Sequence, residues 1–132
     1  MDLIPLDPAH VDERGMIIDL IAGEEINAVT LVTFTEGAVR GNHYHARTIQ
    51  WNYIVSGEIL MATELPGQGR RERVLKRGDF ARSIENERHA LKALSEAVVL
   101  VLTRGPRGGD QYEVDTVRLT EPLIEPAPLE GG

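Results

Sequence analysis

The chain has 132 residues, enough for one hydrophobic core and therefore for a single domain. With 42% hydrophobic and 27% charged residues its composition is that of an ordinary globular protein, and the absence of cysteine excludes disulfides, thiolate metal sites and cysteine nucleophiles. The formal net charge of −7 argues against binding to nucleic acid, which requires a basic face.

The predicted elements are short β-strands separated by turns that contain glycine. Residues 1–14 are expected to form an arm or an edge strand. Residue types that favour strands are concentrated at 28–35, 49–55, 58–65 and 97–103, and less strongly at 16–21, 39–46, 70–76, 79–84, 88–94 and 111–119. Strand starts recur about every ten residues, a spacing typical of an all-β sandwich or barrel. We therefore expect one all-β domain over residues 1–120.

The two ends of the chain and its longest apolar run indicate where the protein is located and which part is irregular. Residues 121–132 hold three prolines and two glycines, which predicts an irregular, partly mobile tail. The first ten residues, MDLIPLDPAH, lack the basic and then apolar layout of a signal peptide. The apolar run at 97–102 suits one buried strand and is too short to span a bilayer. We expect a cytoplasmic protein that does not associate with membranes.

Histidines are the informative feature of the sequence, because the chain has only four of them. His43 and His45 are two residues apart, so on a strand both imidazoles point to one face and Tyr44 points to the other. Gln50 opens the next predicted strand and can face the same interior. His89 lies on a later strand, whereas His10 is isolated near the N-terminus.

These residues resemble the motifs of the cupin family. Gly41, His43, His45, Gln50 and Gly57 have the spacing of the first cupin motif, except that glutamine stands where glutamate is usual. A looser second motif runs from Gly78 to His89, with Ile84, Asn86 and Ala93 where the family has proline, glycine and asparagine. The resemblance covers about half of the chain. It implies a single antiparallel double-stranded β-helix, the jelly-roll barrel of the cupins.

A finer resemblance is to cupins that act on sugar nucleotides: deoxysugar epimerases, sugar ketoisomerases and capsule-assembly cupins. It rests on Arg40-Gly41 before the histidines, on residues 89–94 (HALKAL) and on residues 12–15 (DERG). In the ketoisomerases a glutamine corresponds to Gln50, and the paired histidines act as acid and base without metal. In the capsule-assembly type, two histidines, a glutamate and a distant histidine hold zinc. This chain combines the glutamine of the first with the His89 of the second.

Two chemistries are therefore open. In one, His43, His45 and His89, with Gln50, bind a divalent transition metal such as zinc, iron, nickel or manganese, and no organic cofactor is required. In the other, His43 and His45 transfer protons next to a substrate carbonyl, with Tyr44 as a possible further proton donor. In both, Arg40 is a candidate contact for a phosphate and Asn52 for the substrate, since Asn52 lines the barrel beside Gln50.

Three classes of function fit this pattern. The first is an isomerase or epimerase that acts on a carbohydrate or nucleotide sugar. The second is a metal-dependent oxygenase or lyase for another small organic molecule, because the cupin fold does not fix the reaction. The third is a binding domain without turnover, and ordinary polar residues at a barrel mouth are the simplest alternative. A homodimer is expected, with Trp51, Tyr53 and Val55 on the outer face as candidate contacts.

Overall fold

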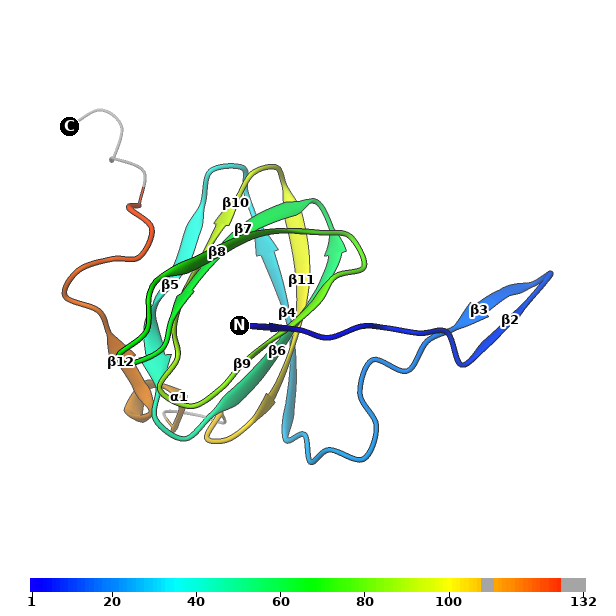
Figure 1. Ribbon diagram of the computed structural model, residues 1–132, viewed down its shortest axis with the longest axis horizontal. Helices are drawn as coiled ribbons and strands as arrows, with labels where there is room; N and C mark the ends of the chain where they lie inside the picture. The colour runs from blue at the N-terminus through cyan, green and yellow to red at the C-terminus, as the bar shows by residue number, and fades with distance from the viewer. Residues whose placement is uncertain (108–110, 127–132) are drawn as a thin grey trace.

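The structure is a computed structural model, which describes residues 1–107 and 111–126. Two five-stranded antiparallel sheets enclose a barrel (Figure 1). In spatial order, the first sheet consists of β1 (Asp2–Leu3), β9 (Phe80–Ser83), β6 (Ile49–Ser56), β11 (Ala97–Arg104) and β4 (Ala28–Phe34). The second sheet consists of β12 (Thr116–Arg118), β5 (Val39–His45), β10 (Arg88–Ala93), β7 (Glu58–Glu64) and β8 (Arg71–Lys76).

The order of the strands identifies the topology. From β4 to β12 each strand lies in the opposite sheet from the one before it, except where β7 and β8 form a hairpin within one sheet. A chain that alternates between two facing antiparallel sheets in this way forms a jelly roll. The prediction of an all-β, antiparallel jelly-roll barrel is confirmed.

The interior of the barrel changes from apolar to polar along its strands. Inward residues of β6 pass from Gln50 and Asn52 to Ile54, and those of β10 pass from His89 to Leu91. The apolar ends of the strands share one core, made of Phe34, Ile54, Ile59, Met61, Leu75, Ala81, Leu91, Ala93, Ala97, Val99 and Val101. The opposite end therefore holds the buried polar side chains, and it is there that a site for chemistry can lie.

A bulge between β5 and β10 aligns two of the histidines. His43 lies directly opposite His89, and the register shifts between His89 and Ala90. Gly41 and Asn42 have φ values of 90° and 58°, a left-handed conformation that favours glycine and tolerates asparagine. A Cβ atom at Gly41 would lie 2.9 Å from the carbonyl oxygen of His89. The glycine is thus required for the close approach of the two strands.

Two short N-terminal strands lie outside the two sheets. β2 (His10–Asp12) and β3 (Gly15–Ile17) pair with each other, and their hairpin projects away from the barrel (Figure 1). β1, by contrast, adds an edge strand to β9, as the arm prediction allowed. Within the described ranges, no helix is long and apolar enough to cross a membrane.

The C-terminal part differs from the prediction of one strand over 111–119. Its first half is a helical turn, α1 (Gln111–Val114), closed by a hydrogen bond from the Asp115 amide to the Gln111 carbonyl. Only Thr116–Arg118 pairs as a strand, along the free edge of β5. Residues 121–126 form neither helix nor strand, and the Asn42 side chain hydrogen-bonds the backbone of Leu123 and Ile124. Residues 127–132 of the predicted tail lie outside the described part.

Candidate functional site

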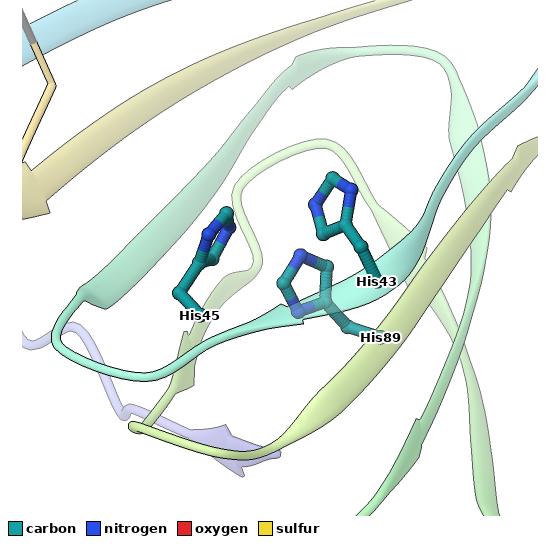
Figure 2. A group of neighbouring side chains, drawn as sticks. All are labelled: His43, His45 and His89. Carbon is teal, nitrogen blue, oxygen red and sulfur yellow. The ribbon is translucent and has the colours of Figure 1, made fainter. Parts of the chain in front are cut away.

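Three histidines from two strands converge inside the barrel. His43 and His45 project from β5 and His89 from β10, and Figure 2 shows their rings turned toward one another. The ring centroids of His43 lie 4.8 Å from His45 and 4.7 Å from His89, and those of His45 and His89 lie 5.4 Å apart. One nitrogen of each ring lies within 4.8 Å of the others, so the group could hold a metal ion.

Backbone carbonyl groups set the protonation of two of the rings. Nδ1 of His89 lies 3.3 Å from the Glu87 carbonyl oxygen. His45 hydrogen-bonds the backbone of Asp115, and its Nδ1 lies 3.3 Å from Thr116 Oγ1. A carbonyl oxygen only accepts, so the ring nitrogen that faces it must carry the hydrogen. The lone pair of His89 is then on Nε2, which is buried and has no hydrogen-bond partner among the described residues.

Burial keeps all three imidazoles neutral near pH 7. Burial, followed by the proximity of His89 and His45, lowers the pKa of His43 to about 3. Burial and then His45 lower the pKa of His89 to about 4. The pKa of His45 is also lowered by burial, although the Asp115 carboxylate opposes this shift. Neutral imidazoles carry the lone pairs that a transition metal binds, so the donor set fits a metal such as zinc.

Gln50 and Asn52 line the same cavity as His43 and His89. The Gln50 side-chain nitrogen donates a hydrogen bond of 3.2 Å to the Asn52 side-chain oxygen. An amide ligates a metal through its oxygen, and this bond uses the nitrogen, so the orientation of Gln50 is compatible with ligation. Asn52 Nδ2 is buried without a hydrogen-bond partner among the described residues. It is therefore a donor available to a bound molecule.

The cavity beside the histidines has a volume of about 250 Å³. Its wall is made of Val32, Phe34, Arg40, Gly41, His43, Gln50, Asn52, His89, Leu91, Val99, Val101, Arg107 and Arg118. Among these described residues three are arginines and none is acidic, although the whole chain has a net charge of −7. The cavity thus combines an apolar wall with a local positive charge, which favours an anionic ligand.

All three arginines contact neighbouring groups, and Arg107 donates a hydrogen bond of 3.4 Å to the Thr30 hydroxyl oxygen. Arg40 donates a hydrogen bond of 3.0 Å to the Thr33 carbonyl oxygen, and its guanidinium carbon lies 5.2 Å from the centre of the Phe34 ring. Arg118 lies 3.6 Å from a carboxylate oxygen of Glu113. All three arginines are nevertheless part of the cavity wall.

The structure brings together most of the residues predicted from the sequence. His43, Gln50, His89, Arg40 and Asn52 all line the cavity, and His45 belongs to the histidine cluster although it is not part of the cavity wall. Tyr44 is not among the lining residues either, and it lies opposite Val117 of the neighbouring strand β12. Its predicted role as a proton donor therefore gains no support from the geometry.

Four residues near the site were missed by sequence reasoning: Arg107, Asp115, Thr116 and Arg118. Thr116 and Arg118 lie opposite His45 and His43 because β12 pairs with β5. The alternating pattern of Thr116, Val117 and Arg118 was the only sequence signal, and it did not identify β5 as the partner strand.

Comparison with known proteins identifies a family whose members resemble this chain. Residues 10–102 match the family described as "Polysaccharide biosynthesis C-terminal domain". The pectin degradation protein KdgF of Dickeya dadantii (strain 3937) is 33% identical over 79 residues, which are 60% of this chain and 67% of that protein.

Solved structures share the fold at low sequence identity. A 3,4-ketoisomerase from Helicobacter canadensis has a TM-score of 0.74 and 22% identity, over 89% of this chain and 89% of that chain. QdtA, a sugar 3,4-ketoisomerase from Thermoanaerobacterium thermosaccharolyticum in complex with TDP, has a TM-score of 0.73 and 20% identity, over 90% and 88% of the two chains. The cupin resemblance is confirmed at the level of the fold.

Proposed function

Because the chain is a cupin that belongs to the polysaccharide biosynthesis C-terminal domain family, we propose that it is a metal-dependent isomerase or epimerase of an anionic carbohydrate. His43, His45 and His89 are the proposed metal ligands, and Gln50 is the proposed fourth. The observation that carries the proposal is the convergence of three buried, neutral imidazoles beside a cavity lined by arginines.

The pKa values favour metal binding over a pair of histidine bases. A general base works best when its pKa is near the pH of the reaction. The pKa of His43, one member of the predicted pair of bases, is about 3, so His43 is a weak base at neutral pH. The pKa of the third histidine, His89, is also low, at about 4. The same lowered values make them good ligands, since protons do not compete with a metal for the ring nitrogens at neutral pH.

The residues of the cavity have separate tasks in the proposed reaction. A bound divalent metal would polarise a carbonyl or hydroxyl oxygen of the substrate. Asn52 Nδ2 would donate a hydrogen bond to a sugar oxygen, and Leu91 and Val101 would pack against the apolar face of the ring. Arg40 and Arg118 would bind an anionic group, since a guanidinium matches a carboxylate or a phosphate.

The relatives support a carbohydrate as the substrate. One is a pectin degradation protein, one is a 3,4-ketoisomerase, and one is a sugar 3,4-ketoisomerase in complex with TDP. The arginines of the cavity favour an anionic sugar derivative, and the cavity of about 250 Å³ is sized for one sugar ring rather than for a whole nucleotide sugar. A uronic acid and a nucleotide sugar are thus two substrates to compare.

Metal-free proton transfer by His45 is the second candidate. Asp115 opposes the lowering of the His45 pKa, which leaves this histidine the better placed of the three to accept a proton. Chelation separates the two candidates. An activity that survives exhaustive dialysis against a chelator would favour His45 as a base and would contradict the metal mechanism.

Elemental analysis of protein purified without an affinity tag tests the metal site. We expect about one equivalent of a transition metal per chain, and we expect it to be lost in His43→Ala and in His89→Ala. The matched control is His10→Ala, because His10 lies on the projecting hairpin away from the cluster. A wild-type protein that binds no zinc, nickel, iron or manganese on titration would refute the metal site.

We also propose a homodimer. The hairpin exposes the apolar side chains of Val11, Met16 and Ile17, and the outer face of β4 exposes Val29 and Leu31. Apolar surface of this kind on a small domain is typical of an interface. One part of the sequence prediction is corrected: Trp51 is only 2% exposed within the chain, so it has almost no surface to offer a partner.

A further inference from the structure

The strand β12 places a second layer of residues behind His45. Thr116 lies directly opposite His45 in the pairing of β12 with β5. Its hydroxyl oxygen is 3.3 Å from His45 Nδ1, and the backbone of Asp115 also hydrogen-bonds the ring. One side of the imidazole is therefore occupied by two consecutive residues that lie 70 and 71 positions further along the chain.

The Asp115 carboxylate accepts hydrogen bonds from the turn that lies between the proposed ligands His45 and Gln50. Asp115 is 4% exposed. It accepts a hydrogen bond of 3.0 Å from the Arg47 amide and one of 2.6 Å from the Thr48 hydroxyl. Arg47 and Thr48 belong to the turn that follows His45 and leads into the strand of Gln50. A buried carboxylate with two strong partners fixes the distance between β12 and this turn.

We propose that Asp115 and Thr116 are positioning residues that hold the His45 ring with its hydrogen on Nδ1 and its lone pair on Nε2, directed toward His43 and His89. The backbone carbonyl of Asp115 only accepts, so it selects the form of the ring that carries hydrogen on the side facing it. The Thr116 hydroxyl limits rotation of the ring, and the Asp115 carboxylate keeps both contacts in place.

The arrangement is the one expected around a metal-binding histidine. Such a histidine generally donates its second ring N–H to a carbonyl or carboxylate group, and loss of that partner costs about 10-fold to 100-fold in metal affinity. His89 has an equivalent contact with the Glu87 carbonyl oxygen. The Asp115–Thr116 pair extends the same support to His45, from a segment that the histidine motif does not include. The metal-affinity part of this inference rests on the proposed function, whereas the ring geometry does not.

The test compares the wild type with Asp115→Ala and Thr116→Val in metal-free protein. Long-range ¹H–¹⁵N NMR spectra at pH 8 distinguish hydrogen on Nδ1 from hydrogen on Nε2. We expect His45 of the wild type to carry it on Nδ1 and both variants to give a mixture. Zinc affinity, measured by competition with a chromophoric chelator, should fall about 10-fold in each variant.

Two controls separate positioning from general stability. Thr116→Ser keeps the hydroxyl and should restore both readouts. Asp79→Asn removes a carboxylate that accepts a hydrogen bond of 2.8 Å from the Lys76 amide in a different turn, and it should change neither. If Asp115→Ala does not fold, Thr116→Val decides, because valine keeps the branched shape of threonine.

The outcomes are distinct. A wild-type His45 with hydrogen on Nε2 would overturn the inference, and so would unchanged NMR spectra and zinc affinity in the folded variants. If the wild type binds no metal but the variants alter the His45 spectrum as expected, the positioning role stands and the proposed metal function fails.

Discussion

Acid should destabilise the metal-free protein through its buried histidines, before most carboxylates titrate. The folded-state pKa of His89 is about 4, against 6.5 for the unconstrained side chain. Between these values the unfolded chain binds more protons than the folded one, so the free energy of unfolding falls as the pH falls from 6.5 toward 4. Above pH 6.5 the contribution is constant.

The size of the effect follows from the two pKa values. At pH 5 the unfolded His89 is almost fully protonated and the folded one is mostly neutral, which lowers the free energy of unfolding by about 2 kcal/mol relative to pH 7.5. His43, with a pKa of about 3, acts in the same direction. For a protein of this size such a loss lowers the melting temperature by several degrees.

Urea unfolding of chelator-treated protein at pH 7.5 and pH 5 measures this difference. The decrease between the two pH values should be about 2 kcal/mol smaller in His89→Gln than in the wild type. His10→Gln, which alters an exposed histidine, should leave it unchanged. An equal decrease in the wild type and in His89→Gln would refute the argument that burial holds His89 in its neutral form.

Four further predictions follow from the same geometry. Gly41→Ala should lower the free energy of unfolding, measured with urea, by about 1–2 kcal/mol because alanine disfavours the left-handed backbone at this position. The contact of the new Cβ atom with β10 should lower it further. In the control Gly37→Ala, where φ is 85° but the surrounding space is open, only the backbone cost should be measured. Arg118→Ala should raise KM for an anionic sugar about 10-fold or more and leave a neutral analogue unaffected in steady-state assays. Leu31→Lys should convert a dimer to a monomer in analytical ultracentrifugation, and a monomeric wild type at micromolar concentration would contradict the dimer. Gln50→Glu should tighten zinc binding in the chelator competition but weaken binding of an anionic substrate, because it adds a negative charge to the cavity.

Local patterns were sufficient to predict the barrel and the centre of the site. Strand propensity and regular turns predict an all-β fold, because each strand is buried on one face and its side chains alternate. The spacing of two residues between His43 and His45 directs both rings inward, whatever strands lie beside them. Gln50 and His89 follow from their distance along the chain to that pair, through the cupin motif.

Residues whose role depends on strand pairing could not be predicted in this way. Thr116 and Arg118 reach the site only because β12 occupies the free edge of β5, a choice made by tertiary contacts. Asp115 is an isolated acidic residue in the sequence, and its proposed positioning role rests on its contacts with the turn after His45. The short helix before it was missed because four residues are too few to show the helical period of 3.6 residues.

The charges of the site connect its two unusual features, the glutamine and the arginines. Three neutral histidines and a neutral amide would leave the full charge of a divalent metal uncompensated. Arg40, Arg107 and Arg118 add further positive charge to the wall of the same cavity. In the proposed function, an anionic substrate would supply the missing negative charge, which a neutral sugar would not. Replacement of the usual glutamate by Gln50 is therefore consistent with a cupin whose ligand, and not its protein, carries the negative charge.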